Sequence, residues 1–174
     1  MTGAVFLEGD KVDLRTIEEE DIEFLRDGVN HPEVRTFITV NRPMNLRQDE
    51  EFFEEVISDE SDVHLAIHNK DEIVGIISLE DEGEIRVGTI GIWLHPDFHG
   101  NGYGTEAAEL ITDYGFNELN YHKITTRAYE NNKGSQRVWE KLGFTQEGTL
   151  RSHIYRNGSF EDALVYGIIE NEWE

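Results

Sequence analysis

The stretch His99-Gly100-Asn101-Gly102-Tyr103-Gly104-Thr105-Glu106-Ala107-Ala108 places three glycines between an apolar run and a helical pattern. Glycine leaves little side chain in the way, so that successive backbone N–H groups can close around a phosphate. The first turn of the following helix adds free N–H groups and the positive end of its dipole. The stretch therefore predicts a phosphate cradle where a strand gives way to a helix.

Two other interpretations of this loop are open. The glycines can serve only a tight turn before a helix. The loop also fits the dinucleotide fingerprint G-x-G-x-x-G/A from Gly102 to Ala107, with Glu130 as the ribose ligand. A dinucleotide site needs its first glycine directly at the strand end, whereas residues 95–99 intervene here. A different phosphate-bearing cofactor fits better.

The rest of the chain predicts alternating groups of strands and helices around this loop. Apolar periodicity of two predicts strands at 11–16, 63–68, 73–79, 84–94, 122–129, 144–155 and 160–169. Periodicity near 3.6 predicts helices at 17–29, 46–57, 103–119 and 135–142. The order is β-α-α-β-β-β-α-β-α-β-β. Short connections predict antiparallel neighbours, and Asn157-Gly158 predicts a hairpin turn. We expect a mixed α/β fold with a mostly antiparallel, twisted central sheet flanked by helices.

Composition bounds the kind of protein. With 174 residues and 37% hydrophobic content, we expect one domain over residues 1–174. No run approaches the roughly 20 apolar residues that span a bilayer, so we expect a cytoplasmic protein without a membrane partner. The absence of cysteine excludes disulfides, thiolate metal sites and a cysteine nucleophile. The seven histidines have no zinc-like spacing, and no metal is expected.

Acidic residues outnumber basic ones 37 to 15, and the formal net charge is −22. Such a chain would repel nucleic acid, so no nucleic-acid partner is expected. Because the acids are spread along the whole chain, they favour a solvated halophilic surface, whose self-repulsion molar salt would screen. The alternative is an acidic surface that attracts basic substrates.

A second motif runs from Glu130 to Phe144, one strand after the glycine loop. Taken alone, it is a short helix that Asn132 or Ser135 caps at its start and Gly143 ends. Taken with the loop, it resembles the GNAT superfamily of acetyl-CoA-dependent N-acetyltransferases. The loop is similar to the family's Q/R-x-x-G-x-G/A motif, and residues 132–144 are similar to its N-x-x-S…G-F segment. The resemblance extends from Lys11 to Trp173, and residues 90–94 and 147–151 are similar to the RimJ/RimL-like branch.

The resemblance implies a GNAT-like fold and acetyl-CoA as the co-substrate. The family pattern implies that the backbone of Trp93 and Leu94 meets the pantetheine arm and that Asn132 contacts pantetheine or orients the thioester. Lys133 and Arg137 are implied as helpers near the phosphates. The loop residues implied to hold the diphosphate are His99, Gly100, Asn101, Gly102, Tyr103, Gly104 and Thr105.

The chain departs from the family pattern at several positions. His99 replaces the usual Gln or Arg of the family motif, and Asn101 replaces a frequent Lys. The loop therefore has little fixed positive charge. Trp139 stands where many members have a tyrosine acid, so a tyrosine mechanism is not available at that position. Ser135 lies where some relatives place the group that protonates the leaving thiolate, so the resemblance implies it as the candidate acid, although helix capping explains a serine there equally well.

The general base has no clear place in the motifs. Thr89 stands where close relatives often have a glutamate. Glu130 is one candidate base, and Glu80 and His122 are others at predicted strand ends.

The resemblance implies acetyl transfer to a primary amine, either a protein N-terminus, such as that of a ribosomal protein, or a small amine. We expect direct attack by the amine, because the chain has no cysteine and no serine in a nucleophile-elbow setting. The alternative is a non-catalytic acyl-CoA-binding or sensing domain. Arg35, Arg42 and Arg47 would either hold an acidic acceptor or cover the protein's own acids. The C-terminal hairpin would support a homodimer.

Overall fold

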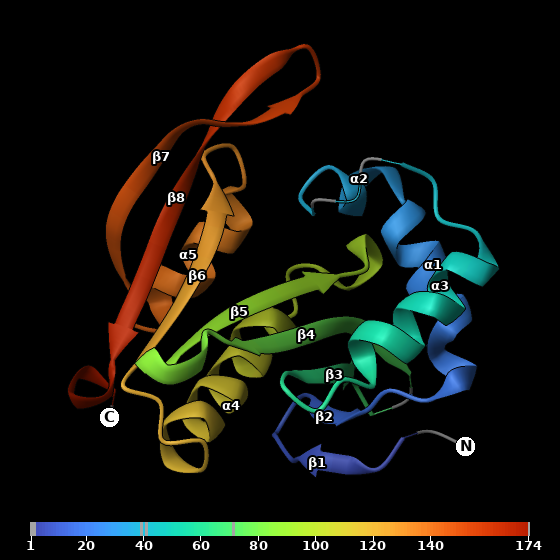
Figure 1. Cartoon of the computed structure of the whole chain (residues 1–174), viewed down its shortest axis with the longest axis horizontal. Coiled ribbons are helices and arrows are strands. Elements are labelled where there is room, and N and C mark those ends of the chain that lie inside the picture. Colours follow the sequence, from blue (N-terminus) through green and yellow to red (C-terminus); the bar gives the residue numbers. More distant parts are fainter. Residues whose placement is uncertain (1–2, 39, 41, 71, 174) are drawn as a thin grey trace.

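The computed structural model describes residues 3–38, 40, 42–70 and 72–173, and its centre is one eight-stranded sheet. The strand order is β1-β2-β3-β4-β5-β6-β8-β7 (Figure 1). All neighbours pair antiparallel except β5 and β6, which run parallel. The mostly antiparallel sheet with flanking helices that the sequence predicts is confirmed.

The strands are β1 Val5–Leu7, β2 Asp13–Thr16, β3 Val63–His68, β4 Ile73–Asp81, β5 Val87–Leu94, β6 Lys123–Tyr129, β7 Thr145–Arg156 and β8 Ser159–Ile169. The α-helices are α1 Ile22–Asn30, α2 Pro32–Arg35, α3 Leu46–Phe52, α4 Tyr103–Asn117 and α5 Lys133–Lys141. A π-helical turn at Phe53–Ile57 continues α3.

The parallel pair of β5 and β6 needs a crossover, and α4 supplies it, as parallel strands require. The two strands pair only from Val87↔Lys123 to Ile90↔Thr126. The Thr126 hydroxyl donates to the Ile90 carbonyl at 2.9 Å, which satisfies a β5 acceptor at the last paired position. Beyond it β5 and β6 run apart, as Figure 1 shows. The backbone of residues 91–94 therefore has no β6 partner on that side.

Helices bury an apolar layer on each face of the sheet. Against α4 lie Leu14, Ile67, Ile77 and Ile124, all with no exposed surface, together with Ala107, Ala108 and Ile111 of the helix itself. On the other face Leu25 of α1 packs in a smaller cluster with Ile17, Ala66 and Ile76. Helices thus cover both faces of the sheet, and they leave the C-terminal end of β5 accessible.

The structure differs from the predicted elements in three places. β1 lies before residue 11, where no strand was predicted, although the apolar run Val5-Phe6-Leu7 could have indicated it. α2 was not predicted either, and Pro32 begins it, because proline suits the first position of a helix. Phe52, which the apolar periodicity of the predicted helix 46–57 would turn inward, is 41% exposed.

Among the described residues, no helix is both long enough and apolar enough to cross a bilayer.

Histidine burial gives the stability of this fold a pH dependence. His68 at the end of β3 is buried, and its Nε2 has no hydrogen-bond partner in the part of the chain that the structure describes. Burial, with a contribution from Arg15, lowers the pKa of His68, while Asp21 and Asp13 offset part of that effect. Burial likewise lowers the pKa of His64, against the opposing charges of Asp62, Glu80 and Asp59.

We expect the free energy of unfolding to fall between pH 7.5 and 5.5. The unfolded chain protonates its histidines near pH 6.5, whereas folded His68 and His64 stay neutral to lower pH. Protons therefore favour the unfolded state in this window. Over the same pH range, the free energy of unfolding of His68→Gln should fall by about 1 kcal/mol less than that of the parent protein. Urea unfolding at several pH values measures this, and identical pH slopes for the two proteins would contradict it.

Candidate functional site

The glycine loop has the geometry of an anion cradle. Gly100 and Gly102 have φ of 81° and 83°, a left-handed backbone that strains other residues. Gly102 is the N-cap of α4 and, having no side chain, forms no capping hydrogen bond. The N–H groups of Tyr103, Gly104 and Thr105 therefore have no partner within the helix. Their arrangement fits a bound phosphate group.

His99 and Asn101 shape this loop. His99 Nε2 lies 3.1 Å from the Leu94 carbonyl oxygen. The Asn101 amide donates to the carbonyl of Phe98 at 3.0 Å. Both side chains thus bind the loop's own backbone, which explains how the loop keeps its form without the basic residues frequent in the family.

Lys11, in the turn between β1 and β2, supplies the positive charge that the loop lacks. A β-carbon added at Gly102 would lie 2.9 Å from Lys11 Nζ, so the ammonium group rests against the loop. The Lys11 backbone N–H donates to Glu106 Oε1 of α4 at 2.8 Å, which fixes the turn there. No local motif in the sequence indicated Lys11, because it precedes Gly102 by 91 positions.

Trp93 and Leu94 lie where β5 has left β6. The Trp93 ring stacks on Phe24 of α1, with ring centroids 5.7 Å apart, and fills the space beside Gly28. Leu94 packs against Gly104, where a β-carbon would meet Leu94 Cδ1 at 3.2 Å. The two side chains anchor β5 to α1 and to the loop, and the backbone between them lines the cleft.

At α5 the structure decides between the two caps that the sequence left open. Asn132 is the N-cap, and its Oδ1 accepts a hydrogen bond from the Ser135 backbone N–H at 3.1 Å. The Ser135 hydroxyl is not used for capping. Instead, its Oγ accepts a hydrogen bond from the indole Nε1 of Trp139 at 3.1 Å.

The remaining predicted residues lie in different places. Lys133 and Arg137 are exposed and line the cleft, and Lys133 Nζ donates to Gln136 Oε1 at 3.2 Å. Glu130 is exposed and does not line it. The Thr89 hydroxyl contacts the carboxylate of Glu82, which brings an acid to the position where the family pattern has one.

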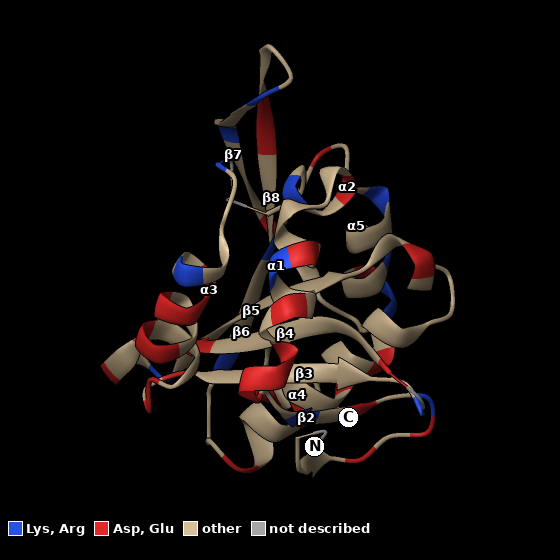
Figure 2. Cartoon of the chain, turned by 90° about the vertical axis from the view of Figure 1, so that its right-hand side faces the viewer, with Lys and Arg blue, Asp and Glu red and all other residues tan. Residues whose placement is uncertain are grey.

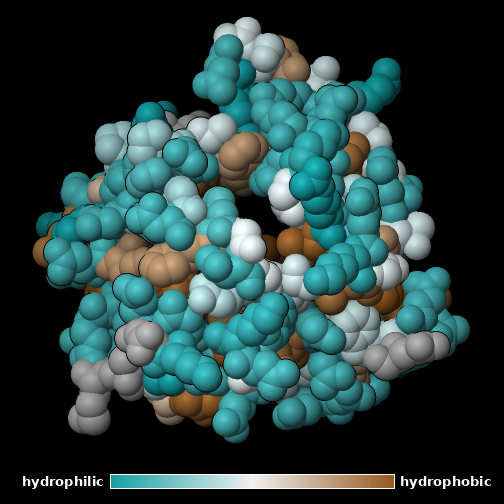
Figure 3. Space-filling model, turned by 180° about the vertical axis from the view of Figure 1, so that it is seen from behind, coloured by the Kyte–Doolittle hydropathy of each residue, from teal (hydrophilic) through white to brown (hydrophobic). Residues whose placement is uncertain are grey.

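One cleft of about 1610 Å³ is lined by Trp93, Leu94, Asn132, Ser135 and most of the glycine loop. Lys11 lies outside this lining, in an adjoining hollow that it shares with Gly102 and Thr105. The cleft extends from the glycine loop along the open end of β5 to α1, α2 and α3. Figure 3 shows the molecule hollowed near its centre, with hydrophobic residues inside and hydrophilic residues around the opening.

Charges in this cleft are segregated by wall. The basic lining residues all come from β6 and α5: Arg127, Lys133, Arg137 and Lys141. The acidic lining residues all come from the opposite side, from α2, α3, β4 and their flanking turns: Glu33, Asp49, Asp62, Glu80, Asp81 and Glu82. Figure 2 shows the acidic bands on α3. The cleft is therefore suited to bind an anionic group at its basic wall and a cationic group at its acidic wall.

Asp49 is the least exposed acid of this acidic wall. Asp49 is only 3% exposed, and its Oδ2 has no hydrogen-bond partner among the described residues. Burial raises the pKa of Asp49, while Arg26 opposes and Asp27 adds to the shift. A buried carboxylate without a partner is unfavourable, and a cation in the cleft would compensate it.

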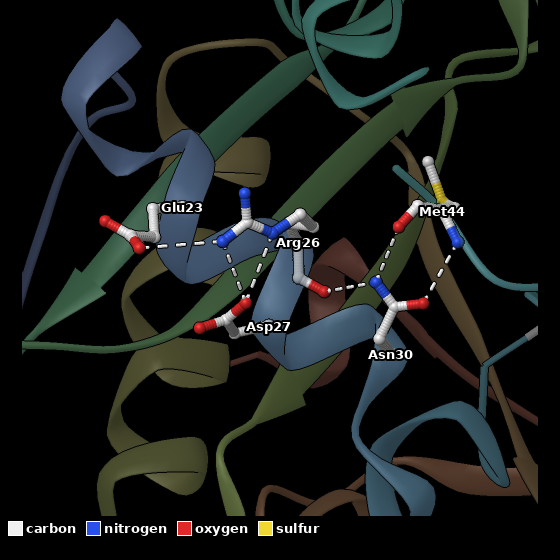
Figure 4. A network of polar contacts seen from close by, with 5 residues as sticks. All are labelled: Glu23, Arg26, Asp27, Asn30 and Met44. Atoms are coloured by element: carbon white, nitrogen blue, oxygen red, sulfur yellow. Dashed lines mark hydrogen bonds and ion pairs between the residues drawn. The ribbon is translucent and has the colours of Figure 1, made fainter. Parts of the chain in front are cut away.

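A polar network places α3 and Asp49 (Figure 4). Asn30 at the end of α1 donates to the carbonyls of Arg26 and Met44, each at 2.8 Å, and accepts from the Met44 N–H at 3.0 Å. The next residue, Asn45, caps α3 through the N–H of Gln48. Arg26 itself is paired with Glu23 and Asp27. Asn30 thus determines where the acidic wall begins.

Arg35, Arg42 and Arg47 were candidates to hold an acidic acceptor. None of them belongs to the described lining of the cleft. Arg47 pairs with Glu51 on α3 at 3.1 Å, in agreement with a role in covering the protein's own acids. No group of three or more His, Cys, Asp or Glu in the described ranges is arranged to hold a metal ion.

A family model and several known proteins are similar to this chain over most of its length. The model of the acetyltransferase (GNAT) domain family matches residues 11–145. The SPbeta prophage-derived uncharacterized N-acetyltransferase YokL of Bacillus subtilis is 30% identical over 168 residues, which cover 95% of this chain and 94% of YokL. The spermidine N(1)-acetyltransferase of Escherichia coli is 26% identical over 163 residues, 93% of this chain and 88% of that enzyme.

Among solved structures, spermidine N-acetyltransferase from Vibrio cholerae in complex with CoA and spermine has a TM-score of 0.88 at 22% identity. The match covers 94% of this chain and 98% of that one. At this identity the likeness bears on the fold.

Replacing Lys11 tests the charge at the loop. Lys11→Gln should weaken coenzyme A binding about fivefold, because a partly exposed lysine near a phosphate contributes about 1 kcal/mol. The difference should shrink in molar salt, which screens the pair. Calorimetric titration of both proteins at low and high KCl measures this. Lys70→Gln, an exposed lysine beyond β3, is the matched control and should bind as the parent does.

Proposed function

The chain belongs to the GNAT acetyltransferase family and is an acyltransferase, and we propose that it moves an acetyl group from acetyl-CoA to a small amine that carries a second positive charge. Family membership rests on the match over residues 11–145. The segregation of charge between the two walls of the cleft carries the proposal for the acceptor.

The glycine loop, together with the basic wall beside it, fits acetyl-CoA. Free N–H groups at the start of α4 and the ammonium group of Lys11 would hold the diphosphate. The open edge of β5 at Trp93 and Leu94 would receive the pantetheine arm, with Asn132 beside it. Acetyl-CoA, when bound, supplies the activated thioester.

The acidic side of the cleft fits a cationic amine. Six carboxylates line it, and Asp49 among them has an unpartnered, buried oxygen. A second ammonium group in the acceptor would pair with this wall while the reacting amine lies near β5. The name of the Escherichia coli relative, a spermidine acetyltransferase, supports an acceptor of this kind.

The chemistry needs a neutral amine, an acceptor for its proton and a hydrogen-bond donor for the departing sulfur. Glu80 and Glu82 flank Thr89 on the acidic wall and would take the proton through water. Glu130, exposed and outside the cleft lining, stays a prediction. Ser135 would donate to the sulfur. The chain has no cysteine and no serine in a nucleophile-elbow setting, which supports direct transfer without an acyl-enzyme.

Turnover by the unmodified protein distinguishes this proposal from a non-catalytic acyl-CoA-binding domain. We expect free CoA to appear when acetyl-CoA is mixed with spermidine or 1,4-diaminobutane, as followed with a thiol reagent. A panel of N-terminal peptides, including those of ribosomal proteins, tests the other predicted acceptor class. Binding of acetyl-CoA without CoA release from any amine would favour the sensing domain.

Asp49→Asn tests whether the second ammonium group of the acceptor pairs with Asp49. With 1,4-diaminobutane its KM should rise about tenfold, equivalent to about 1.4 kcal/mol, because an ammonium–carboxylate pair in the cleft is lost. With 1-aminobutane, which has the same chain and one charge, KM should stay unchanged. Asp113→Asn, an exposed acid on α4, is the control. Equal changes for both amines would rule out this role.

We also propose that the distributed acidic surface is an adaptation to salt. With a net charge of −22, self-repulsion is strong when the Debye length is about 10 Å and weak when it is about 3 Å. Thermal unfolding should therefore move to a higher Tm between 0.1 M and 1 M KCl. Because KCl is close to neutral in its effect on apolar burial, an unchanged Tm would argue against the adaptation.

Three further expectations remain proposals. The similarity at residues 90–94 and 147–151 supports a place in the RimJ/RimL-like branch. A homodimer would use the C-terminal hairpin, where β7 is the outer strand of the sheet. Activity in the cytoplasm would suit an enzyme that uses acetyl-CoA.

A further inference from the structure

We propose that Trp139 is a positioning residue, which orients the Ser135 hydroxyl so that its proton faces the cleft and meets the departing sulfur. This inference rests on the proposed acetyl transfer and assigns a role to a tryptophan that cannot itself act as an acid. It concerns one hydrogen bond within α5.

Helix geometry brings the two side chains together. Ser135 and Trp139 are four positions apart on α5, so they lie on the same face of the helix. Because Asn132 caps the helix, the Ser135 side chain is free for another bond. Both residues line the cleft, on the same wall as Lys133 and Arg137.

Trp139 determines which part the Ser135 hydroxyl plays. Trp139 has no exposed surface, and its ring is held against Phe144, with centroids 5.2 Å apart. An indole N–H is a donor only, and a buried donor needs a partner. Ser135 Oγ, at 3.1 Å, is that partner.

The consequence concerns the proton of Ser135. Since Oγ already accepts from Trp139, its own O–H points elsewhere, and no acceptor for it is found among the described residues. The open direction for this hydroxyl is the cleft that both residues line. A preoriented donor of this kind stabilises charge that develops during a reaction.

The transfer step balances with this donor. The amine nitrogen forms the new C–N bond, the C–S bond breaks, and sulfur keeps the bonding electron pair. Ser135 O–H donates a hydrogen bond to the thiolate as its charge develops. The proton that the amine releases passes to the acidic wall and solvent, and the sulfur then takes one proton from solvent.

A double-mutant cycle tests the coupling by steady-state kinetics. Ser135→Ala should lower kcat about 30-fold, and Trp139→Phe should lower it about tenfold, with KM for acetyl-CoA within about twofold. The double variant should be no slower than Ser135→Ala alone, because Trp139 acts through Ser135. Ser135→Thr, which keeps the hydroxyl, should recover most of kcat.

The hydrogen bond itself has a readout that does not depend on activity. A ¹H–¹⁵N spectrum would report on the indole N–H groups of Trp93, Trp139 and Trp173, with each signal assigned by a single Phe replacement. Ser135→Ala should move the Trp139 signal upfield in the protein without ligand. Ser135→Thr should leave it near its original position.

Two controls separate orientation from packing. Phe144→Leu loosens the contact with the Trp139 ring but keeps its N–H, so kcat should stay within about twofold. Trp173→Phe removes a comparable indole bond, to Asp113 Oδ1 at 3.3 Å on the outer side of α4, and should leave kcat unchanged.

The outcomes are distinguishable. If the two single losses multiply in the double variant, or if Ser135→Ala leaves the Trp139 signal in place, the positioning role is wrong while the acetyl transfer stands. If Trp139→Phe does not fold, the Ser135→Ala, Ser135→Thr and Phe144→Leu data still decide the question. If the parent protein transfers acetyl groups to no amine, the proposed function fails, and the role of Ser135 with it.

Discussion

The limited pairing between β5 and β6 is the constraint on which the rest of the site depends. The two parallel strands share hydrogen bonds only as far as Ile90 and Thr126, where the Thr126 hydroxyl satisfies the Ile90 carbonyl. Continued pairing would close the sheet and remove the cleft. Because the strands part, the cleft opens along the free edge of β5, between a helix N-terminus on one side and α1 on the other.

The cleft acquires its charge pattern from segments far apart in the chain. Its basic wall comes from consecutive elements, β6 and α5, whereas its acidic wall is assembled from α2, α3 and β4. The Asn30 bonds to Met44 hold the start of α3 in place, so that Asp49 lies at this wall. In a chain with a net charge of −22, the position of four basic groups on one wall matters more than their number.

In the second motif, a tryptophan at position 139 in place of the family's frequent tyrosine changes which side chains can take part in catalysis. A tryptophan at 139 has no acidic proton, but its buried N–H needs an acceptor and finds it in Ser135. Asn132 caps α5, so Ser135, the other candidate cap, is not needed for this role. A polar pair of this kind has one satisfied arrangement, which gives the serine hydroxyl a defined direction.

Local patterns in the sequence were enough for the position of the glycine loop before α4 and for most strands and helices in their order, because each depends on residues close together in the chain. Backbone freedom at Gly100 and Gly102 and apolar periodicity are properties of this kind. Only the tertiary structure revealed Lys11 at the loop, the partner of the Ser135 hydroxyl and the unpartnered carboxylate of Asp49. These depend on strand pairing, side-chain direction and burial, which bring together residues whose separation along the chain carries no signal of their contact.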